Sequence, residues 1–310
     1  MKESSSPALI EPSADRRRIR IRAPAKINLC LHVGAKRPDG YHDLESLVVF
    51  AAFGDELLIE RDRGFSLAIG GPFAEDLSRG DDNLVLKAAR LLAARARADI
   101  GARFILTKRI PPASGVGGGS ADAAAALRGL ARLWNLRVSN DEMQTIAAVI
   151  GSDVPVCLDS KVAWMEGRGE RVRSLRPLPG MSMILVNPKV QVSTAEVFRR
   201  LRQRRGTGFS PPPSSFAEAI DLVRYLQSTT NDLEPAAAQI APVIGEVLEE
   251  IRRLPGVLLA RMSGSGATCF GLMKDAESDR ESIRGLRQRY RDWWVVETVL
   301  PPPQIAPAEI

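Results

Sequence analysis

The glycine-rich stretch 110–127 could bind a phosphate group. It holds four glycines within five positions, Gly115, Gly117, Gly118 and Gly119. Glycine lets successive backbone N–H groups turn toward one point and lets a ligand approach the main chain. An alanine-rich segment of high helix propensity follows, and we expect Ser120 and Asp122 to cap this helix. Because a helix N-terminus has unpaired N–H donors and a partial positive charge, the stretch is predicted to cradle a phosphate.

The spacing of the glycines excludes two common phosphate loops. No Lys-Ser or Lys-Thr pair follows them, so the stretch is not a Walker A loop. Ser120 stands where a dinucleotide-binding Gly-x-Gly-x-x-Gly motif requires its third glycine. A tight structural connection is the plain alternative for any glycine-rich turn. The number of glycines and the hydroxyl at the helix entrance favour phosphate binding.

Composition indicates a globular chain with a large core. The 310 residues are 45% hydrophobic and 26% charged, which is typical of about two domains. Lys and Arg number 43 against 37 Asp and Glu, a formal net charge of +6. This modest excess suits an anionic small substrate and is thin for a protein that binds nucleic acid.

Several features of the sequence indicate the cellular compartment of the protein. Cys30, Cys157 and Cys269 lie far apart in apolar runs, which predicts buried thiols in a reducing compartment without a disulfide frame. With only two histidines, a structural zinc site is not expected. The N-terminal segment lacks the apolar core of a signal peptide, and no apolar run reaches the roughly 20 residues that span a bilayer. We expect a cytoplasmic protein that does not bind membranes.

Hydrophobic periodicity predicts a strand-rich first hundred residues and mixed elements after them. Strands are expected at 18–33 with a break at Pro24, and at 44–53, 56–61, 65–69, 104–108, 162–165, 183–187, 258–262, 267–273 and 293–299. Helices are expected at 83–98, 120–134, 139–151, 217–227, 234–254 with an interruption at Pro242, and 276–290. Residues 152–155 are predicted to be a compact connection, and 199–215 a helix end with an exposed linker. The pattern predicts an α+β fold.

Turn and cap signals place several polar residues. The turn signal 38–40, Pro-Asp-Gly, presents Tyr41 and His42 immediately after it. Ser139 and Glu142 have the spacing of a capping box at the start of a helix.

Three separated segments resemble, in order and spacing, the three motifs of the GHMP kinases. This superfamily comprises galactokinase, homoserine kinase, mevalonate kinase and phosphomevalonate kinase. The three segments are Pro24-Ala25-Lys26-Ile27-Asn28-Leu29, the loop 111–121, and Met262-Ser263-Gly264-Ser265-Gly266-Ala267. Four more segments, Arg37-Pro38-Asp39-Gly40-Tyr41-His42, Asp82-Asn83-Leu84-Val85, Gly151-Ser152-Asp153-Val154-Pro155 and Asn231-Asp232-Leu233-Glu234, are similar to one branch of it. That branch phosphorylates 4-diphosphocytidyl-2-C-methyl-D-erythritol in the non-mevalonate pathway to isoprenoids.

The resemblance implies a fold and an activity. It implies ATP-dependent phosphorylation of the 2-hydroxyl of this CDP-methylerythritol, with Mg²⁺ accompanying the ATP. It also implies an N-terminal, ribosomal-protein-S5-like ATP-binding domain at 19–175 and a C-terminal α/β-sandwich domain on the substrate side at 176–300. The active-site cleft would lie between the two domains. Residues 1–18 are expected to be a disordered tail and 301–310 a second tail.

Two charged residues are implied to carry the chemistry. By resemblance Asp153 is the catalytic base, and Lys26 lies beside it and polarises the hydroxyl or keeps the carboxylate charged. Taken alone, the sequence favours a helix-capping aspartate before Pro155 and a solvated strand lysine. The two motifs around them reverse that preference.

The resemblance also assigns binding residues. ATP is assigned to Pro111, Pro112, Ala113, Ser114, Gly115, Val116, Gly117, Gly118, Gly119, Ser120, Ala121 and Asn83. The substrate is assigned to Asn28, Tyr41, His42, Thr194 and Phe198, with Tyr41, His42 and Phe198 on the cytosine side. Support of the phosphate side is assigned to Ser263, Gly264, Ser265 and Gly266. The plain alternatives are structural rings at 41 and 42 and an ordinary hairpin turn at 263–267.

The loop departs from the family pattern at two places. Ala121 replaces a second serine that is common there, so either Ser120 or a water molecule is left to contact the Mg²⁺ that ATP carries. Residues 112–114, Pro-Ala-Ser, replace a start that is richer in glycine in the family. We expect no other metal site, and a monomer or weak homodimer.

Two other functions compete with this assignment. Another kinase of the superfamily, of the homoserine or mevalonate type, gives no reason for Tyr41 and His42 or for the setting of Asp153. An RNA-binding module would use the strand-rich first half and the basic clusters 16–22 and 199–205. Those clusters lack interleaved aromatic residues, so solvated faces explain them well.

Overall fold

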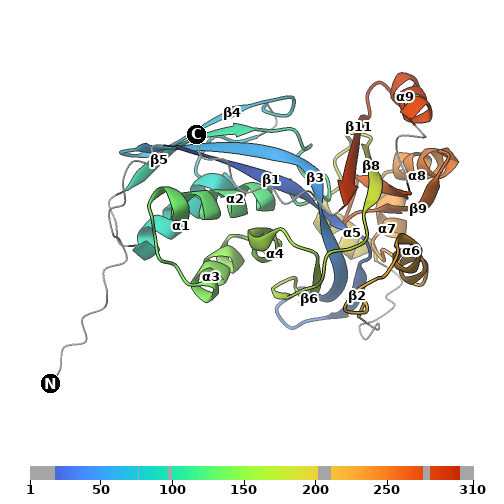
Figure 1. Cartoon of the computed structure of the whole chain (residues 1–310), viewed down its shortest axis with the longest axis horizontal. Helices are drawn as coiled ribbons and strands as arrows, with labels where there is room; N and C mark the ends of the chain where they lie inside the picture. Colours follow the sequence, from blue (N-terminus) through green and yellow to red (C-terminus); the bar gives the residue numbers. More distant parts are fainter. Residues whose placement is uncertain (1–17, 76, 97–99, 202–210, 275–279, 301–310) are drawn as a thin grey trace.

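The structure is a computed structural model that describes residues 18–75, 77–96, 100–201, 211–274 and 280–300. Within these residues the chain forms two sheets, each packed against helices (Figure 1). The predicted tails 1–17 and 301–310, and much of the predicted linker 199–215, lie outside the described residues.

Strand β3, His42–Asp62, is the spine of the first sheet. It pairs with β1 (Arg18–Asn28), β2 (His32–Lys36), β5 (Gly101–Thr107) and β6 (Ala163–Gly167). The prediction of two strands separated at Gly54 and Asp55 is wrong, because Gly54 continues the strand. A Cβ at Gly54 would meet the carbonyl oxygen of Ala23, so glycine permits the close approach of β1.

The first sheet is completed at its edges by β4 (Phe65–Gly70) and β7 (Arg171–Ser174), and β7 was not expected from the sequence. Strands β4 and β5 are parallel and are joined by helix α1, Leu84–Ala96. Strand β1 runs through Pro24 where a break was predicted. A register shift between Pro24 and Lys26 marks this point as a bulge.

Helices α1 to α4 lie along one face of this sheet (Figure 1). They include α2 (Gly118–Leu133), α3 (Asn140–Ile150) and α4 (Val154–Asp159). The alanines of α2 are buried and let the helix approach β1 and β3 closely. The capping box of Ser139 and Glu142 is confirmed. The connection predicted at 152–155 is instead the start of α4, with Pro155 in its first turn, where proline is favoured.

The second sheet is antiparallel, with the order β11-β8-β10-β9. Its strands are β8 (Met181–Asn187), β9 (Val257–Met262), β10 (Cys269–Met273) and β11 (Trp294–Leu300). Its helices are α5 (Thr194–Arg200), α6 (Ala219–Gln227), α7 (Glu234–Ile240), α8 (Val243–Arg253) and α9 (Arg280–Arg289). Pro242 separates α7 from α8, which confirms the predicted interruption.

The two sheets share a core. Ile27 and Val49 of the first sheet belong to the same buried cluster as Leu185 and Phe270 of the second. The loop after β1 is bonded to the segment before α7, because the N–H of Leu31 donates to the oxygen of Thr230 at 2.9 Å. The predicted α+β class is confirmed, and β1 leads directly to the junction of the two sheets.

The predicted burial of the thiols is also confirmed. Cys30, Cys157 and Cys269 are free and buried. Burial raises the pKa of Cys30 to about 11, so this thiol is no nucleophile at neutral pH. In the described parts of the chain, helices are too short or too polar to cross a membrane.

Two helical glycines test the packing of α2. A Cβ at Gly129 would meet Cδ1 of Ile59, whereas a Cβ at Gly285 in α9 would meet nothing within 4 Å. We expect Gly129→Ala to lower the free energy of unfolding by about 1–3 kcal/mol because the core is overpacked. Gly285→Ala should raise it by about 0.5–1 kcal/mol through helix propensity. Urea unfolding of the two variants measures the difference, and equal effects would contradict close packing at Gly129.

Candidate active site

Lys26 and Asp153 form an ion pair beside the glycine loop. The side chain of Lys26 is 4% exposed, and its Nζ lies 2.7 Å from Oδ2 of Asp153, whose side chain is 36% exposed. The backbone N–H of Lys26 donates to the oxygen of Val116 at 2.9 Å. A Cβ at Gly117 would lie 3.2 Å from Cβ of Lys26, so the lysine stem packs under the loop. Asp153 precedes α4, yet its carboxylate makes no capping hydrogen bond and stays available to a ligand.

The glycine loop ends directly on helix α2. Gly117 is the N-cap residue, with the left-handed φ of 62° that glycine readily adopts, and the helix begins at Gly118. The expectation that Ser120 and Asp122 cap this helix is therefore wrong. The first intrahelical hydrogen bond runs from the N–H of Ala121 to the oxygen of Gly117, at 2.9 Å. The preceding N–H groups of the first turn have no intrahelical acceptor, as a phosphate cradle requires.

Backbone hydrogen bonds and one hydroxyl join the three sequence motifs. Oγ of Ser263 accepts from the N–H of Asn28 at 3.0 Å and donates to the oxygen of Gly115 at 3.0 Å. The N–H of Thr268 donates to the oxygen of Ser114 at 3.0 Å. A single buried serine thus links strand β1, the glycine loop and the turn between β9 and β10.

The turn 263–267 and the glycine loop touch backbone to backbone. A Cβ on Gly115 would lie 2.5 Å from the oxygen of Ser263, and one on Gly264 would lie 2.6 Å from the oxygen of Gly115. Nδ2 of Asn231 donates to the oxygens of Met262 and Gly264, both at 2.8 Å, and holds the turn from behind. Glycine is required here because no side chain fits between the two turns.

The residues expected on the cytosine side come from two elements. The rings of His42 on β3 and Phe198 on α5 are stacked, with centroids 5.4 Å apart and an interplanar angle of 17°. Nδ1 of His42 lies 3.3 Å from the oxygen of Gly34. Oγ1 of Thr194, at the start of α5, lies 2.8 Å from Oγ of Ser265. Helix α5 therefore connects the ring pair with the turn 263–267.

Tyr41 has an exposed ring that lies next to a cation. Its side chain is 56% exposed, and the guanidinium of Arg168 lies 5.1 Å from the centre of its ring. Arg168 is in the turn between β6 and β7, and a Cβ at the next residue, Gly169, would lie 3.1 Å from the oxygen of Ser152. This turn thus reaches from Tyr41 to the residue before Asp153.

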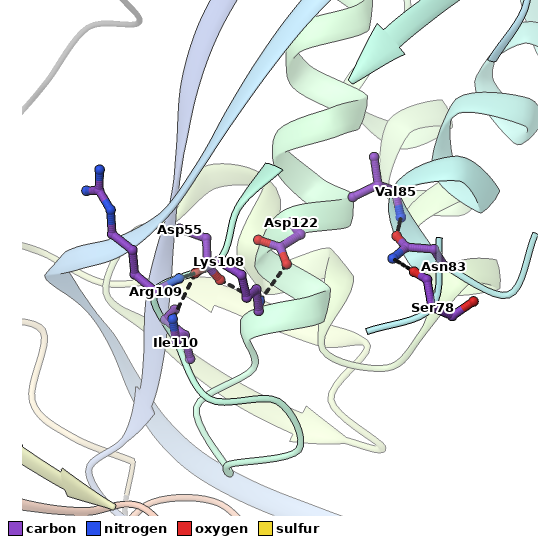
Figure 2. A network of polar contacts seen from close by, with 8 residues as sticks. All are labelled: Asp55, Ser78, Asn83, Val85, Lys108, Arg109, Ile110 and Asp122. Atoms are coloured by element: carbon purple, nitrogen blue, oxygen red, sulfur yellow. Dashed lines mark hydrogen bonds and ion pairs between the residues drawn. The ribbon is translucent and has the colours of Figure 1, made fainter. Parts of the chain in front are cut away.

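Asn83 and Ala121 lie at the two helices next to the loop. Oδ1 of Asn83 accepts from the N–H of Val85 at 2.9 Å, so its amide occupies the start of α1 (Figure 2). Leu84 lies next to Gly119, where an added Cβ would be 3.5 Å from Cδ1 of Leu84. Ala121 is 1% exposed and belongs to the core of the first sheet. A second hydroxyl at position 121 would be buried in this core, which explains why alanine is accommodated.

The beginning of the loop is strained. Ala113 has a φ of 49°, in the left-handed region that favours glycine. This is the place where the sequence departs from a start that is richer in glycine. Strain of this kind costs about 1–3 kcal/mol and persists where the surrounding structure fixes the backbone.

Two buried polar atoms without a hydrogen-bond partner lie in or beside the same loop. In the described part of the chain these are Oγ of Ser114, in the loop, and Oδ1 of Asn28, whose backbone N–H bonds Ser263. Such atoms cost free energy in a folded protein unless a ligand or water satisfies them. Their position around the loop supports a polar ligand there.

Sequence reasoning missed several residues of this region. Ser46 accepts from Nδ2 of Asn28 at 2.7 Å and Arg168 contacts Tyr41, but neither lies in a segment that was assigned a role. Lys108 and Asp55 form a buried ion pair at 2.5 Å next to the loop. No periodicity marks these side chains, because their partners are far away in the sequence.

Comparison with known proteins agrees with this geometry. Residues 83–161 match the GHMP kinases N terminal domain, and residues 214–292 match the GHMP kinases C terminal family. The chain is 49% identical over 272 residues to the 4-diphosphocytidyl-2-C-methyl-D-erythritol kinase of Rhodospirillum rubrum, covering 88% of this chain and 89% of that protein.

Two solved structures are similar. A crystal structure of 4-(cytidine 5'-diphospho)-2C-methyl-D-erythritol kinase matches with a TM-score of 0.74 and 32% identity, covering 91% of this chain and 99% of that one. The homoserine kinase of Cytophaga hutchinsonii matches with a TM-score of 0.69 and 17% identity, covering 97% of this chain and all of that one (100%). The second likeness shows a shared fold.

The fold and the joined motifs define a GHMP kinase, and the chain belongs to this family. The predicted resemblance and the two-domain GHMP fold are confirmed. Within the family the chain belongs to the 4-diphosphocytidyl-2-C-methyl-D-erythritol kinases.

The hydroxyl of Ser263 tests how far the three motifs depend on one another. Ser263→Ala leaves the buried N–H of Asn28 without its acceptor. We expect the free energy of unfolding to fall by about 1–3 kcal/mol, because a buried donor loses its partner. Ser265→Ala is the matched control, since the hydroxyl of Ser265 bonds that of the exposed Thr194. An equal or larger loss in the control variant would contradict the linking role of Ser263.

Proposed function

We propose that the protein transfers the γ-phosphoryl group of ATP to the 2-hydroxyl of 4-diphosphocytidyl-2-C-methyl-D-erythritol, a step of non-mevalonate isoprenoid synthesis. The observation that carries this proposal is the pair of Lys26 and Asp153, 2.7 Å apart, beside a loop that ends on a helix N-terminus. The identity to kinases named for this substrate supports the choice of acceptor.

The loop 111–121 binds the phosphates of ATP in this proposal. The unpaired N–H groups of Gly118, Gly119 and Ser120 face the anion at the positive end of α2. Asn83 and the start of α1 lie at the side of the loop, where Leu84 lies next to Gly119. Phosphoryl transfer depends mostly on such positioning and charge neutralisation.

Mg²⁺ arrives with ATP. Ser120 suits it, because its hydroxyl is a hard oxygen ligand in the first turn of α2 and is partly exposed. In the described residues no three His, Cys, Asp or Glu side chains are grouped to hold a metal ion. The ion supplies neutralisation of phosphate charge.

Asp153 accepts the proton of the substrate hydroxyl. The oxygen of that hydroxyl forms a bond to the γ-phosphorus while the bond from that phosphorus to the bridging oxygen breaks, and ADP leaves. The ammonium of Lys26 holds the carboxylate in place and stabilises the negative charge that develops on the attacking oxygen.

The cytosine base is recognised by rings. His42 and Phe198 offer a stacked pair, and Tyr41 adds a third, exposed ring. Asn28 and Thr194 provide polar contacts on the acceptor side, close to the turn 263–267. The guanidinium of Arg168, which also lies 3.8 Å from Oδ2 of Asp39, brings a cation next to the ring of Tyr41.

The alternatives are less well supported. Homoserine and mevalonate carry no base, so those acceptors leave the pair of His42 and Phe198 without a ligand. Of the basic cluster proposed for RNA, Arg199 and Arg200 are ion-paired with Glu196 on the same helix. This pairing favours a solvated helix face.

A coupled assay of ADP release tests the proposal. Purified protein is given Mg-ATP with CDP-methylerythritol, homoserine or mevalonate as acceptor. Turnover is expected with CDP-methylerythritol alone. Turnover confined to homoserine or mevalonate would overturn the assignment.

Asp153→Asn tests the role of Asp153 as the general base. We expect kcat to fall about 10²–10⁴-fold, the usual range for a general base, with little change in ATP affinity. Asp159→Asn, at the other end of the same helix α4, is the matched control and should keep its turnover. The assignment fails if Asp153→Asn turns over at nearly the wild-type rate.

His42→Ala tests recognition of the cytosine base of the substrate. Loss of the ring should raise KM for CDP-methylerythritol about 3–10-fold, because an aromatic pair adds about 0.5–1.5 kcal/mol. The KM for ATP should stay unchanged. Tyr290→Ala removes one ring of a stacked pair in the second part of the chain, Tyr290 and Trp293, and controls for loss of stability. An unchanged KM for CDP-methylerythritol in His42→Ala would exclude the stacking role.

A further inference from the structure

A buried ion cluster lies directly behind the glycine loop. Nζ of Lys108 is 2.5 Å from Oδ2 of Asp55 and 2.7 Å from Oδ2 of Asp122 (Figure 2). The side chains are 1%, 0% and 4% exposed in that order. No residue of this cluster is among those that the chemistry above uses.

The cluster joins three elements at the two ends of the loop. Lys108 follows β5, Asp55 lies on β3, and Asp122 is in the second turn of α2. Oδ1 of Asp55 also accepts from the N–H groups of Arg109 and Ile110, at 2.6 and 2.9 Å. One carboxylate thus holds the chain where it enters the loop, and the other holds the helix onto which the loop ends.

The ammonium lies under the first residue of the helix. A Cβ at Gly118 would be 3.1 Å from Nζ of Lys108, so the absence of a side chain makes room for this cation. Burying three charged groups is costly, and an ion pair of this kind is rarely the most stable filling of a core. A role in fixing a geometry explains its presence better than stability does.

We propose that Asp55, Lys108 and Asp122 are positioning residues for the nucleotide, which hold both ends of the glycine loop so that its N–H groups face the phosphates before ATP arrives. This inference rests on the proposed function of the loop. It extends that function by assigning ATP affinity to side chains that do not touch ATP.

The charge of the cluster is compatible with a neighbouring anion. Burial, offset in part by Lys108, raises the pKa of Asp122 to about 7. Burial therefore favours the protonated form of Asp122, and in that form the charges of Lys108 and Asp55 balance each other. Oδ1 of Asp122 has no partner in the described structure. Burial thus acts against a full negative charge behind the loop.

Two variants separate positioning from stability. Lys108→Met strands buried carboxylates and should lower both the unfolding midpoint and the affinity for ATP. The double variant Lys108→Met/Asp122→Leu removes the cation together with one of the two carboxylates, while the other, Asp55, keeps its two backbone donors. Because one buried ion pair is then replaced by apolar groups, the unfolding midpoint should recover relative to Lys108→Met.

The affinity for ATP should not recover with it. We expect the dissociation constant of Mg-ATP, measured without acceptor by calorimetry, to stay about tenfold or more above wild type in the double variant, as small misplacements of binding groups do. KM for CDP-methylerythritol should stay within about twofold, because the residues assigned to that substrate do not lie on the elements that carry Lys108 and Asp122. Glu250→Gln is the control that loses stability alone, because Glu250 is a buried carboxylate of α8, far along the chain, that pairs with the exposed Arg253 and Arg289.

Wild-type affinity for Mg-ATP in the double variant would overturn the inference. A second measurement uses the unmodified protein, so that it holds even where variants fold poorly. Amide exchange at Arg109 and Ile110 should be slow without nucleotide and unchanged by Mg-ATP. Exchange that becomes slow only with Mg-ATP would show that the nucleotide, and not the cluster, orders the loop. Binding of Mg-ATP without turnover of CDP-methylerythritol would contradict the proposed function and leave this test intact.

Discussion

The contact of two glycine turns, backbone against backbone, is the constraint on which the site depends. Gly115 and Gly264 each approach the main chain of the other's turn at distances that no side chain permits. One turn follows the first sheet and the other belongs to the second, so this contact fixes how the two halves meet. The hydroxyl of Ser263 also accepts a hydrogen bond from the N–H of Asn28. Lys26 lies two residues earlier on the same strand, β1, so its position is fixed as well. Three motifs far apart in the sequence become neighbours because two backbones can touch.

The long strand β3 connects the loop region with the ring pair. Its first residues carry His42, its middle carries Asp55 behind the loop, and its length lets it pair with strands on both sides. A strand interrupted at Gly54 could not hold a base-binding ring at one end and a loop anchor further along in a fixed relation. The close approach of β1 at Gly54 therefore matters for the site as well as for the sheet.

Much of the fold could be predicted from the sequence, because strong signals agreed. The capping box at Ser139 and the break at Pro242 depend on local chemistry alone, and both are present. Short elements such as α4 and β7 could not be predicted, since tertiary contacts stabilise a six-residue helix or a four-residue strand. The start of α2 was misplaced for a related reason. Gly117 caps the helix with a left-handed backbone conformation and packs closely against Lys26. Because no side chain makes a capping hydrogen bond, the sequence does not show where the helix starts.

Burial divides the charged residues of the site into two kinds. Lys26 and Lys108 are both buried, and each meets aspartates at hydrogen-bonding distance. The carboxylate beside Lys26 is 36% exposed, whereas those beside Lys108 are 0% and 4% exposed. A group that takes a proton from a substrate has to be reachable, and a group that holds a loop gains rigidity from being sealed in the core. Sequence patterns cannot make this distinction, because Asp122 and Asp153 both lie close to the start of a helix. The depth of each carboxylate, set by packing, decides which of the two can take part in chemistry.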